Sequence, residues 1–346
     1  MKPLPDPRCF ESERFDSLGA LATAAANAAP ATQQEKFLAL CAKVSAALAD
    51  GREAEVRDAV WRTGSAAASE LYWRAIDRAL APPQENLLQV RVFAMPILLV
   101  TGGRADAVVP GVIPDAGELR RLLSDAGAMG PVRHFALSNT LASADALEGV
   151  PMTKLYRVAR AMELEPAELD LPPQDVRTAM VEEAVSLRFI VGAAVTSAGA
   201  PGFVETAGNI GGWGMPFTKA LAAQLRVPRL SLLPVPRPPA TLLQALRGGR
   251  FAQRELGFQL FLSNALRLAR MRSGDPDVTL AAHADASIRV RLTSRFDAGL
   301  DEQYRWPLDP VDDLAAVTDS ICSLLAECRL DHVEVLDDVQ DVEKKN

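Results

Sequence analysis

Residues 88–100 read LQVRVFAMPILLV and residues 185–196 read VSLRFIVGAAVT, and these two stretches decide the predicted fold. Each is a nearly continuous apolar run, which is typical of a strand buried on both faces of a sheet. Pro96 interrupts the first run, and because proline has no N–H to donate to a ladder, it indicates an edge position or a bulge. Gly192 stands within one residue of the corresponding place in the second run. We therefore predict that both runs are strands of a central sheet.

The segments that follow the two runs are of the same kinds and come in the same order. After the first run come a glycine-containing loop, a helix that begins near Asp115, a strand over Val132–Leu137 and a helix at about 152–163. After the second come a glycine-rich stretch, a helix at about 216–225 and a short strand over Leu230–Leu233. Strands that alternate with helices favour a mainly parallel sheet. The repeated order also suggests two similar strand–helix units that arose by tandem duplication.

Helices precede these two units, and strands of a different pattern follow them. Residues 288–292 read IRVRL, an alternation typical of antiparallel strands with one solvated face. The predicted fold class is α/β, with a mixed and mainly parallel sheet, an N-terminal helical layer and an antiparallel C-terminal extension. The predicted segments are an irregular lead-in (1–15), the helical layer (16–84), a first α/β unit (85–171), a second α/β unit (172–273), antiparallel strands with a helix (274–336) and a disordered tail (337–346).

The composition is that of an ordinary soluble globular protein. Hydrophobic residues make up 49% of the chain and charged residues 23%, which argues against disorder. The net charge of −7 argues against a protein that coats nucleic acid. The four cysteines form no C-x-x-C pair, no signal-peptide pattern opens the chain, and the longest apolar run is too short to span a bilayer. We therefore expect a cytoplasmic protein of bacterial type without membrane insertion.

The most suggestive motif for a ligand is GNIGGWG at residues 208–214, between the second apolar run and a helix. Glycines at such a junction let backbone N–H groups turn toward an anion, and a helix N-terminus favours negative charge. The spacing matches neither G-x-G-x-x-G nor a P-loop, so a flexible connection with Trp213 as its packing anchor is the alternative. The candidate ligand-binding residues are Gly208, Gly211, Gly212, Gly214 and Lys219, with Gly102, Gly103 and Arg104 from the matching loop after the first run.

No motif points to a metal or to catalysis. No G-x-S-x-G elbow occurs, and the acidic group at 309–313 is explained by helix capping and by the helix dipole rather than by a cation. The histidines lack metal-ligand spacing and are His134, His283 and His332. The sequence therefore names no catalytic residue, no metal and no cofactor.

Two further segments bear on binding partners. Arg247, Arg250 and Arg254 are candidates for a basic contact face, with a solvated face balanced by nearby acids as the alternative. Residues 151–169, PMTKLYRVARAMELEPAEL, resemble the closing helices of phage-repressor-like helix-turn-helix domains, and the resemblance implies DNA binding. Upstream, where the recognition helix belongs, residues 130–139 read GPVRHFALSN. That segment predicts a strand and a loop, which argues against DNA binding.

These observations leave three functional hypotheses. The first is a non-catalytic interaction protein, such as an assembly, adaptor or regulatory component, that acts through contacts with a protein partner. The alternative is an enzyme or a binder of a small molecule or nucleotide that uses the loops 102–114 and 198–214, which is an argument from the fold class alone. A DNA-binding regulator is the remote alternative. The lack of a catalytic motif favours the first hypothesis.

Overall fold

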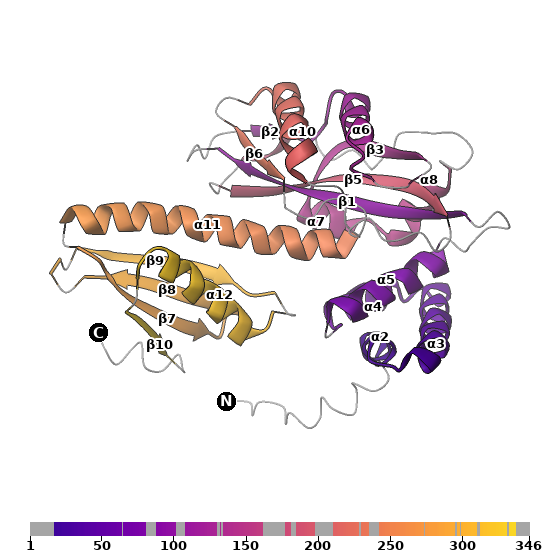
Figure 1. The fold of residues 1–346 in the computed structure, drawn as a ribbon, viewed down its shortest axis with the longest axis horizontal. Coiled ribbons are helices and arrows are strands. Elements are labelled where there is room, and N and C mark those ends of the chain that lie inside the picture. The colour runs from indigo at the N-terminus through magenta and orange to yellow at the C-terminus, as the bar shows by residue number, and fades with distance from the viewer. Residues whose placement is uncertain are drawn as a thin grey trace. The chain divides into compact units, whose positions relative to one another are not determined.

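The computed structural model divides into two compact units, one that extends to Arg250 and one that begins at Phe251 (Figure 1). The structure describes residues 17–63, 65–80, 88–101, 108–129, 132, 134–161, 177–180, 185–197, 210–227, 230–234, 242–272, 274–294, 296–297, 299–309, 312–330 and 332–336. Among these residues, no helix is both long enough and apolar enough to cross a membrane.

The predicted N-terminal helical layer is present in the first unit. Its described helices are α2 (Leu18–Ala26), α3 (Pro30–Ala49), α4 (Glu53–Trp61) and α5 (Ala66–Leu80). Tyr72 on α5 is buried, and its hydroxyl donates to the backbone oxygen of Val56 on α4 at 2.9 Å. Burial, more than the nearby Glu55 carboxylate, raises the pKa of Tyr72. The hydroxyl therefore stays protonated and holds α4 to α5.

The central sheet of the first unit is wholly antiparallel, so the prediction of a mainly parallel sheet is wrong. β1 (Leu88–Val100) and β5 (Val185–Ser197) pair with each other along all 13 residues of each strand. β3 (His134–Ser143) lies on the other side of β5, and β6 (Ser231–Pro234) lies on the other side of β1. The strand order is therefore β3-β5-β1-β6. Pro96 adjoins Ile97, the residue at which the described pairing of β1 with β6 ends.

The physical reason for this error is that the two strand–helix units are interleaved. Helix α6 (Ala116–Asp125) connects β1 to β3, and these two strands are parallel to each other, as the alternation of strands and helices predicts. However, β5 is inserted between them, and β1 in turn lies between β5 and β6, which α10 (Ile210–Leu225) connects. Every neighbouring pair in the sheet consequently runs antiparallel. β5 begins 97 residues after β1, and β6 begins 97 residues after β3.

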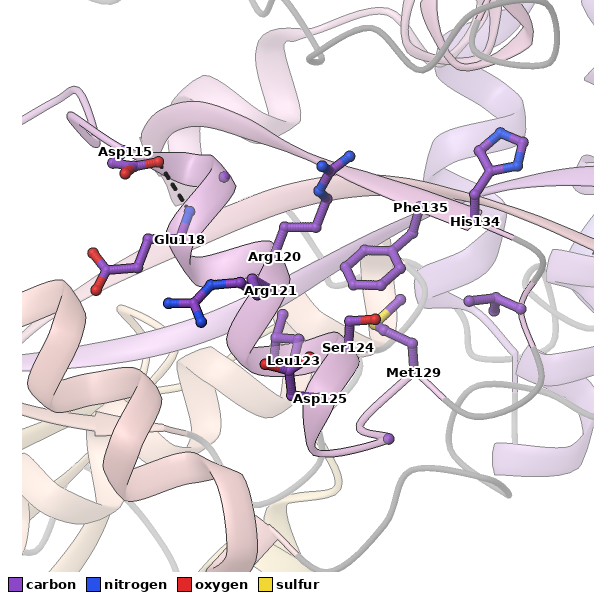
Figure 2. Close-up of a pocket in the computed structure, with 13 residues that line it drawn as sticks. Asp115, Glu118, Arg120, Arg121, Leu123, Ser124, Asp125, Met129, His134 and Phe135 are labelled. Carbon is purple, nitrogen blue, oxygen red and sulfur yellow. Dashed lines mark hydrogen bonds between the residues drawn. The ribbon is translucent and has the colours of Figure 1, made fainter.

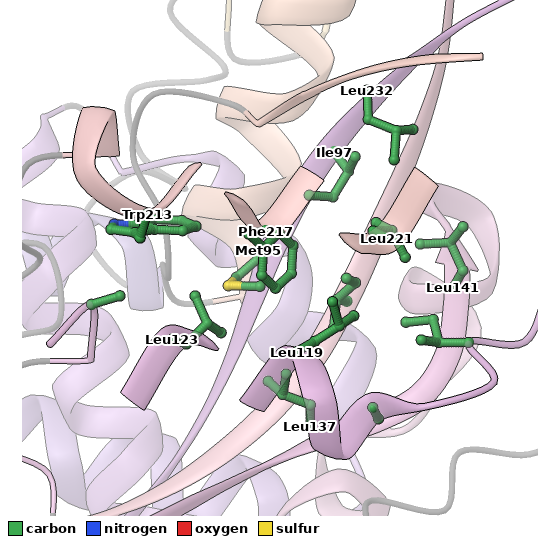
Figure 3. Packing of buried hydrophobic residues seen from close by; sticks show 14 of the residues in the cluster. Met95, Ile97, Leu119, Leu123, Leu137, Leu141, Trp213, Phe217, Leu221 and Leu232 are labelled. Carbon is green, nitrogen blue, oxygen red and sulfur yellow. The ribbon is translucent and has the colours of Figure 1, made fainter. Parts of the chain in front are cut away.

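Helices α6 and α10 cover one face of this sheet and form a hydrophobic core with it (Figure 3). Met95 of β1, Leu119 of α6 and Phe217 of α10 belong to this core. Trp213 packs edge-on against Phe217, with the ring centres 5.9 Å apart. Gly249 of α11 (Leu242–Arg272) lies against Pro96, which alternates with Met95 and therefore faces the opposite side of the sheet. A small sheet of β2 (Val108–Pro110) and β4 (Arg177–Met180) completes the described strands of this unit.

Gly192 is required at the centre of the sheet, where it pairs with Phe93 of β1. A Cβ atom on Gly192 would lie 2.2 Å from Cζ of Phe93 and 2.8 Å from the backbone oxygen of Ala136 on β3. Both distances are far below van der Waals contact. The phenylalanine ring therefore occupies the space that a side chain at position 192 would need.

The second unit contains the predicted antiparallel strands with a helix. Its elements after α11 are β7 (Asp277–His283), β8 (Ser287–Thr293), β9 (Asp301–Pro307), α12 (Leu314–Glu327) and β10 (Val333–Leu336). The strand order is β10-β7-β8-β9, and all neighbours are antiparallel except β10 and β7. The period of two is confirmed on β8, where Ile288, Val290 and Leu292 are buried and Arg289 is exposed. Residues of α11 from Phe258 onward and of α12 cover the buried face.

Candidate functional site

A broad hollow of about 990 Å³ lies along α6 and the beginning of β3 (Figure 2). Figure 2 shows Arg120 and Arg121 on α6, and the ring of His134 pointing away from the ring of Phe135. Asp115 at the start of α6 accepts a hydrogen bond from the backbone N–H of Glu118 at 2.9 Å and thereby caps the helix.

Asp115 and Glu118 at the N-terminal end of α6 also form hydrogen bonds with α10. The side-chain amide of Gln224 on α10 donates to Oε2 of Glu118 at 2.8 Å and to the backbone oxygen of Asp115 at 3.1 Å. These two acids therefore have structural partners within the fold. In the part of the chain that the structure describes, no group of three or more His, Cys, Asp or Glu residues could hold a metal ion. The hollow thus presents a charged face of α6, which includes Arg120 and Arg121.

The glycine motif at 208–214 is largely helical rather than a loop. Gly211, Gly212 and Gly214 belong to α10, which begins at Ile210, and Lys219 is exposed further along the same helix. Trp213 is buried, as a packing anchor would be. Of the remaining candidate ligand-binding residues, Gly102, Gly103, Arg104 and Gly208 lie outside the described residues. Most of the two predicted loops, at 102–107 and 198–209, lies outside the described residues, so the ligand site there stays a prediction.

The three candidate arginines of the contact face have different surroundings. Arg247 is half-buried, and Arg250 forms an ion pair with Glu148 at 2.9 Å in the first unit. Arg254 belongs to the second unit and is only 8% exposed. The guanidinium of Arg254 donates to the backbone oxygen of Pro307 at 2.7 Å and to Oδ2 of Asp312 at 2.5 Å. These contacts could not be predicted from a local pattern, because the partners are more than fifty residues apart.

The acidic group at 309–313 has structural roles in the described residues. Asp313 caps α12 by accepting a hydrogen bond from the backbone N–H of Ala315 at 3.0 Å. Asp309 lies 3.3 Å from Arg254, and Asp312 both pairs with Arg254 and accepts from the backbone N–H of Asp309. Capping therefore explains Asp313, whereas the buried arginine explains the other two acids.

Within the segment that resembles a helix-turn-helix domain, residues 152–161 form a packing helix, and residues 162–169 lie outside the described residues. α8 (Met152–Ala161) follows the short helix α7 (Ala144–Gly149), and its Leu155 and Tyr156 are buried. Upstream, residues 134–139 belong to strand β3. A strand stands where a recognition helix would be required, so the described residues offer no helix for the major groove at that place.

The sequence analysis did not identify the ion pair of Glu53 and Arg57 on α4, which caps the start of α8 and the end of α7. Oε1 of Glu53 accepts a hydrogen bond from the backbone N–H of Met152 at the start of α8, and its Oε2 accepts from the hydroxyl of Thr153 at 3.2 Å. Arg57, one turn further on α4, donates to the backbone oxygens of Glu148 and Val150 at the end of α7. The carboxylate of Glu53 thus lies at the positive N-terminus of α8, and the guanidinium of Arg57 lies at the negative C-terminus of α7. The four-residue spacing of Glu53 and Arg57 was the visible signal.

Replacing Glu53 by glutamine is expected to lower the free energy of unfolding by about 1–2 kcal/mol, because the amide cannot supply a charged acceptor at the start of α8. Chemical denaturation followed by circular dichroism measures this loss. Glu55→Gln is the matched control, since Glu55 pairs with Arg52 and both side chains are about half exposed; its expected cost is below about 0.5 kcal/mol. Equal costs for the two variants would contradict the capping role.

An apolar groove of about 120 Å³ opens in the second unit, where α12 begins and β10 ends. Its wall includes Leu280 on β7, and also Leu314 and Val335, which are 45% and 51% exposed. Val335 pairs with Leu280 and therefore points to the core face of the sheet. At the other edge of the sheet, Trp306 of β9 is fully buried on the same face. The hydrophobic core of this unit is consequently closed at β9 and open at β10.

No protein-family model matches the chain, and neither the curated proteins nor the solved structures gave a match.

Proposed function

We propose that this chain is a non-catalytic cytoplasmic protein that works through contact with another polypeptide, as an assembly, adaptor or regulatory component. The observation that carries the proposal is the open core of the second unit at β10, where Leu314 and Val335 are about half exposed although they belong to the core side. Apolar side chains left uncovered at a sheet edge are typical of a protein-binding surface. The free thiols of Cys41, Cys322 and Cys328 support a reducing compartment.

The contrast between the two edges of the sheet supports this assignment. β9 reads DEQYRWP, and its charges and terminal proline are features that keep an edge strand from pairing with another chain. β10 reads VEVL and carries a single charge. Among the described residues, β10 has a neighbouring strand on one side only. The edge at β10 is therefore the one suited to receive a further strand.

The occupant that fits this edge is an extended segment of a partner protein that adds a strand beside β10. Its alternate apolar side chains would cover Leu314 and Val335 and so complete the core. Glu334 is exposed on β10, and Asp337 and Asp338 follow the strand in the sequence. Charge complementarity therefore favours basic residues on either side of the apolar segment.

A photo-reactive benzoylphenylalanine placed at position 335 in the living host tests this proposal. The expected result is a crosslink to one other polypeptide, which mass spectrometry maps to an extended apolar segment with basic neighbours. Position 303 on β9 is the matched control, because Gln303 is exposed on the opposite edge strand, and no crosslink is expected there. Equal crosslinking from both positions, a crosslink only to a second copy of this chain, or no crosslink from position 335 would each overturn the proposal.

A further inference from the structure

Two charged side chains are buried among the residues that the structure describes, those of Arg188 on β5 and Arg254 on α11. Arg188 is 9% exposed and Arg254 is 8% exposed. The guanidinium of Arg254 forms ion pairs with Asp309 and Asp312. Arg188 has no such pair, and its one hydrogen bond in the described structure runs from Nη1 to the backbone oxygen of the preceding residue, Leu187, at 3.1 Å. Arg188 is therefore a buried cation without a counter-ion.

Arg188 cannot escape the cost of burial by losing its charge. Burial lowers the pKa of Arg188, but a guanidinium in a protein stays protonated at neutral pH. A buried charge without a partner destabilises a fold, and an apolar side chain of similar size is often the more stable choice. The charge of Asp145 on α7 acts against the lowering of the pKa, but this side chain is exposed and forms no ion pair with Arg188 in the described structure. The fold thus retains at position 188 a charge that it does not itself neutralise, and such exceptions are expected at functional sites.

The pairing of the strands places Arg188 near one end of the central sheet. It lies opposite Ile97 of β1 and opposite Ser143, the last residue of β3. Opposite residues on neighbouring strands point to the same face, and Ile97 belongs to the core beneath α6 and α10. The side chain of Arg188 therefore leaves the sheet on that face. Ser186, two residues earlier on β5, points to the same face and is half-buried. A guanidinium beside a serine hydroxyl is a set of donors that suits an anion.

One nitrogen of the guanidinium remains within reach of such an anion. Nη1 is engaged with Leu187, and Nε is sealed from water without a partner. Nη2 has no hydrogen bond in the described structure and is not among the sealed atoms, so it is open to solvent. An anion can therefore approach Arg188 at Nη2 without a rearrangement of the core.

The charges around Arg188 restrict the anion to a single negative charge. One carboxylate neutralises one guanidinium. A phosphate group carries a charge of about −1.5 to −2 at pH 7 and would leave excess negative charge at a buried site. The carboxylate of Asp145 already contributes negative charge there. A monocarboxylate therefore fits the site better than a phosphate.

We propose that Arg188 binds the carboxylate of a small monoanionic compound, which accepts hydrogen bonds from Nη2 of Arg188 and from the hydroxyl of Ser186 near the start of β5. The compound belongs to the class of simple aliphatic monocarboxylates, because only a narrow group can reach a side chain that is nine-tenths buried. The site does not depend on the protein contact at β10, because Arg188 and β10 lie in different units.

Acetate is the probe for this site, and acetamide is its neutral control of the same shape. Titrations of the full chain are followed by the ¹H–¹⁵N signals of the arginine Nε–H groups, since the Nε atoms of Arg188 and Arg254 are sealed from water and exchange slowly. We expect acetate to move the Arg188 signal, to leave the Arg254 signal in place, and to bind at least about tenfold tighter than acetamide. No change of the Arg188 signal, equal affinity for acetamide, or tighter binding of inorganic phosphate would refute the proposal.

Arg188→Met makes the test specific, because it removes the charge and keeps a long side chain. This variant should no longer bind acetate, and without acetate its urea midpoint should equal or exceed that of the parent chain. Arg254→Met is the matched control, since Arg254 is equally buried but paired, and its midpoint should fall. If the midpoint of Arg188→Met falls as far as that of Arg254→Met, or if Arg188→Met does not fold, Arg188 already has a counter-ion within the chain and the proposal fails.

Ser186→Ala tests the second donor of the site. Loss of one neutral hydrogen bond should weaken acetate binding about two- to tenfold. The urea midpoint should change little, because Ser186 is only half-buried. Acetate affinity equal to that of the parent chain would contradict the proposed contact.

Discussion

Replacing Gly192 by alanine is expected to lower the free energy of unfolding of the first unit by about 3 kcal/mol. The added methyl group would lie 2.2 Å from the ring of Phe93 and 2.8 Å from the backbone oxygen of Ala136. The ring could turn away only by disturbing the core beneath α6 and α10, and the backbone contact would remain. Urea denaturation, followed by the far-ultraviolet circular dichroism of the variant and the parent chain, measures the loss.

Gly248→Ala is the matched control for this substitution. Gly248 is inside helix α11, and a Cβ atom there would meet nothing within 4 Å. Alanine is the better helix former, so this variant should gain up to about 1 kcal/mol. The combination of Gly192→Ala with Phe93→Ala should cost less than the two single costs added together, because the clash with the ring is gone. Simple additivity would show that Phe93 is not the cause.

The second large effect is expected at Arg254, where replacement by methionine should lower the stability of the second unit by about 3 kcal/mol. The side chain is 8% exposed, and its guanidinium serves Asp309, Asp312 and the backbone oxygen of Pro307 at the same time. Without it, Asp309 and Asp312 lose the cation that pairs with both of them. Thermal or chemical unfolding followed by the fluorescence of Trp306, which is buried in this unit, reports the change.

Arg270→Met on the same helix is the control for Arg254. Arg270 pairs with Asp275, and both side chains are about half exposed, so its loss should cost about 1 kcal/mol or less. Asp309→Asn together with Asp312→Asn should recover part of the stability of Arg254→Met, because the repulsion between the two carboxylates is removed. Arg254→Lys should remain destabilised, since an ammonium group cannot reach three acceptors as the planar guanidinium does. No recovery by the double asparagine variant would contradict a role for charge.

The four strands of the central sheet were predictable from the sequence, but their directions were not, and β2 and β4 were not predicted. The apolar runs at 88–100 and 185–196 correctly marked β1 and β5, because a strand that is buried on both faces needs apolar residues at nearly every position. Hydrophobicity carries no information about which strand lies beside which. The insertion of β5 between β1 and β3 depends on side-chain fit, such as the fit of Phe93 over Gly192, and this fit involves residues about one hundred positions apart.

The candidate sites were less predictable than the strands for a related reason. That an acid of the group at 309–313 caps a helix was predictable because capping is a local interaction, but the pattern did not single out Asp313 as the cap of α12. The lack of a carboxylate partner at Arg188 depends on the strands on either side of it, and no local pattern shows this. In the same way, Val335 looks like any strand residue in the sequence. Only the position of Leu314 at the start of α12 shows that the core is left open there.

The interleaved sheet has a consequence for how this protein is made. β1 leaves the ribosome long before its partner, since β5 begins 85 residues after β1 ends. Through that interval a strand of 13 residues, most of them apolar, has no neighbour to pair with, and such exposed segments are prone to aggregate. The four-stranded sheet is complete only when β6 has been translated as far as Pro234. The sheet of the first unit therefore cannot form from either strand–helix unit alone, and folding must wait until both have been synthesised.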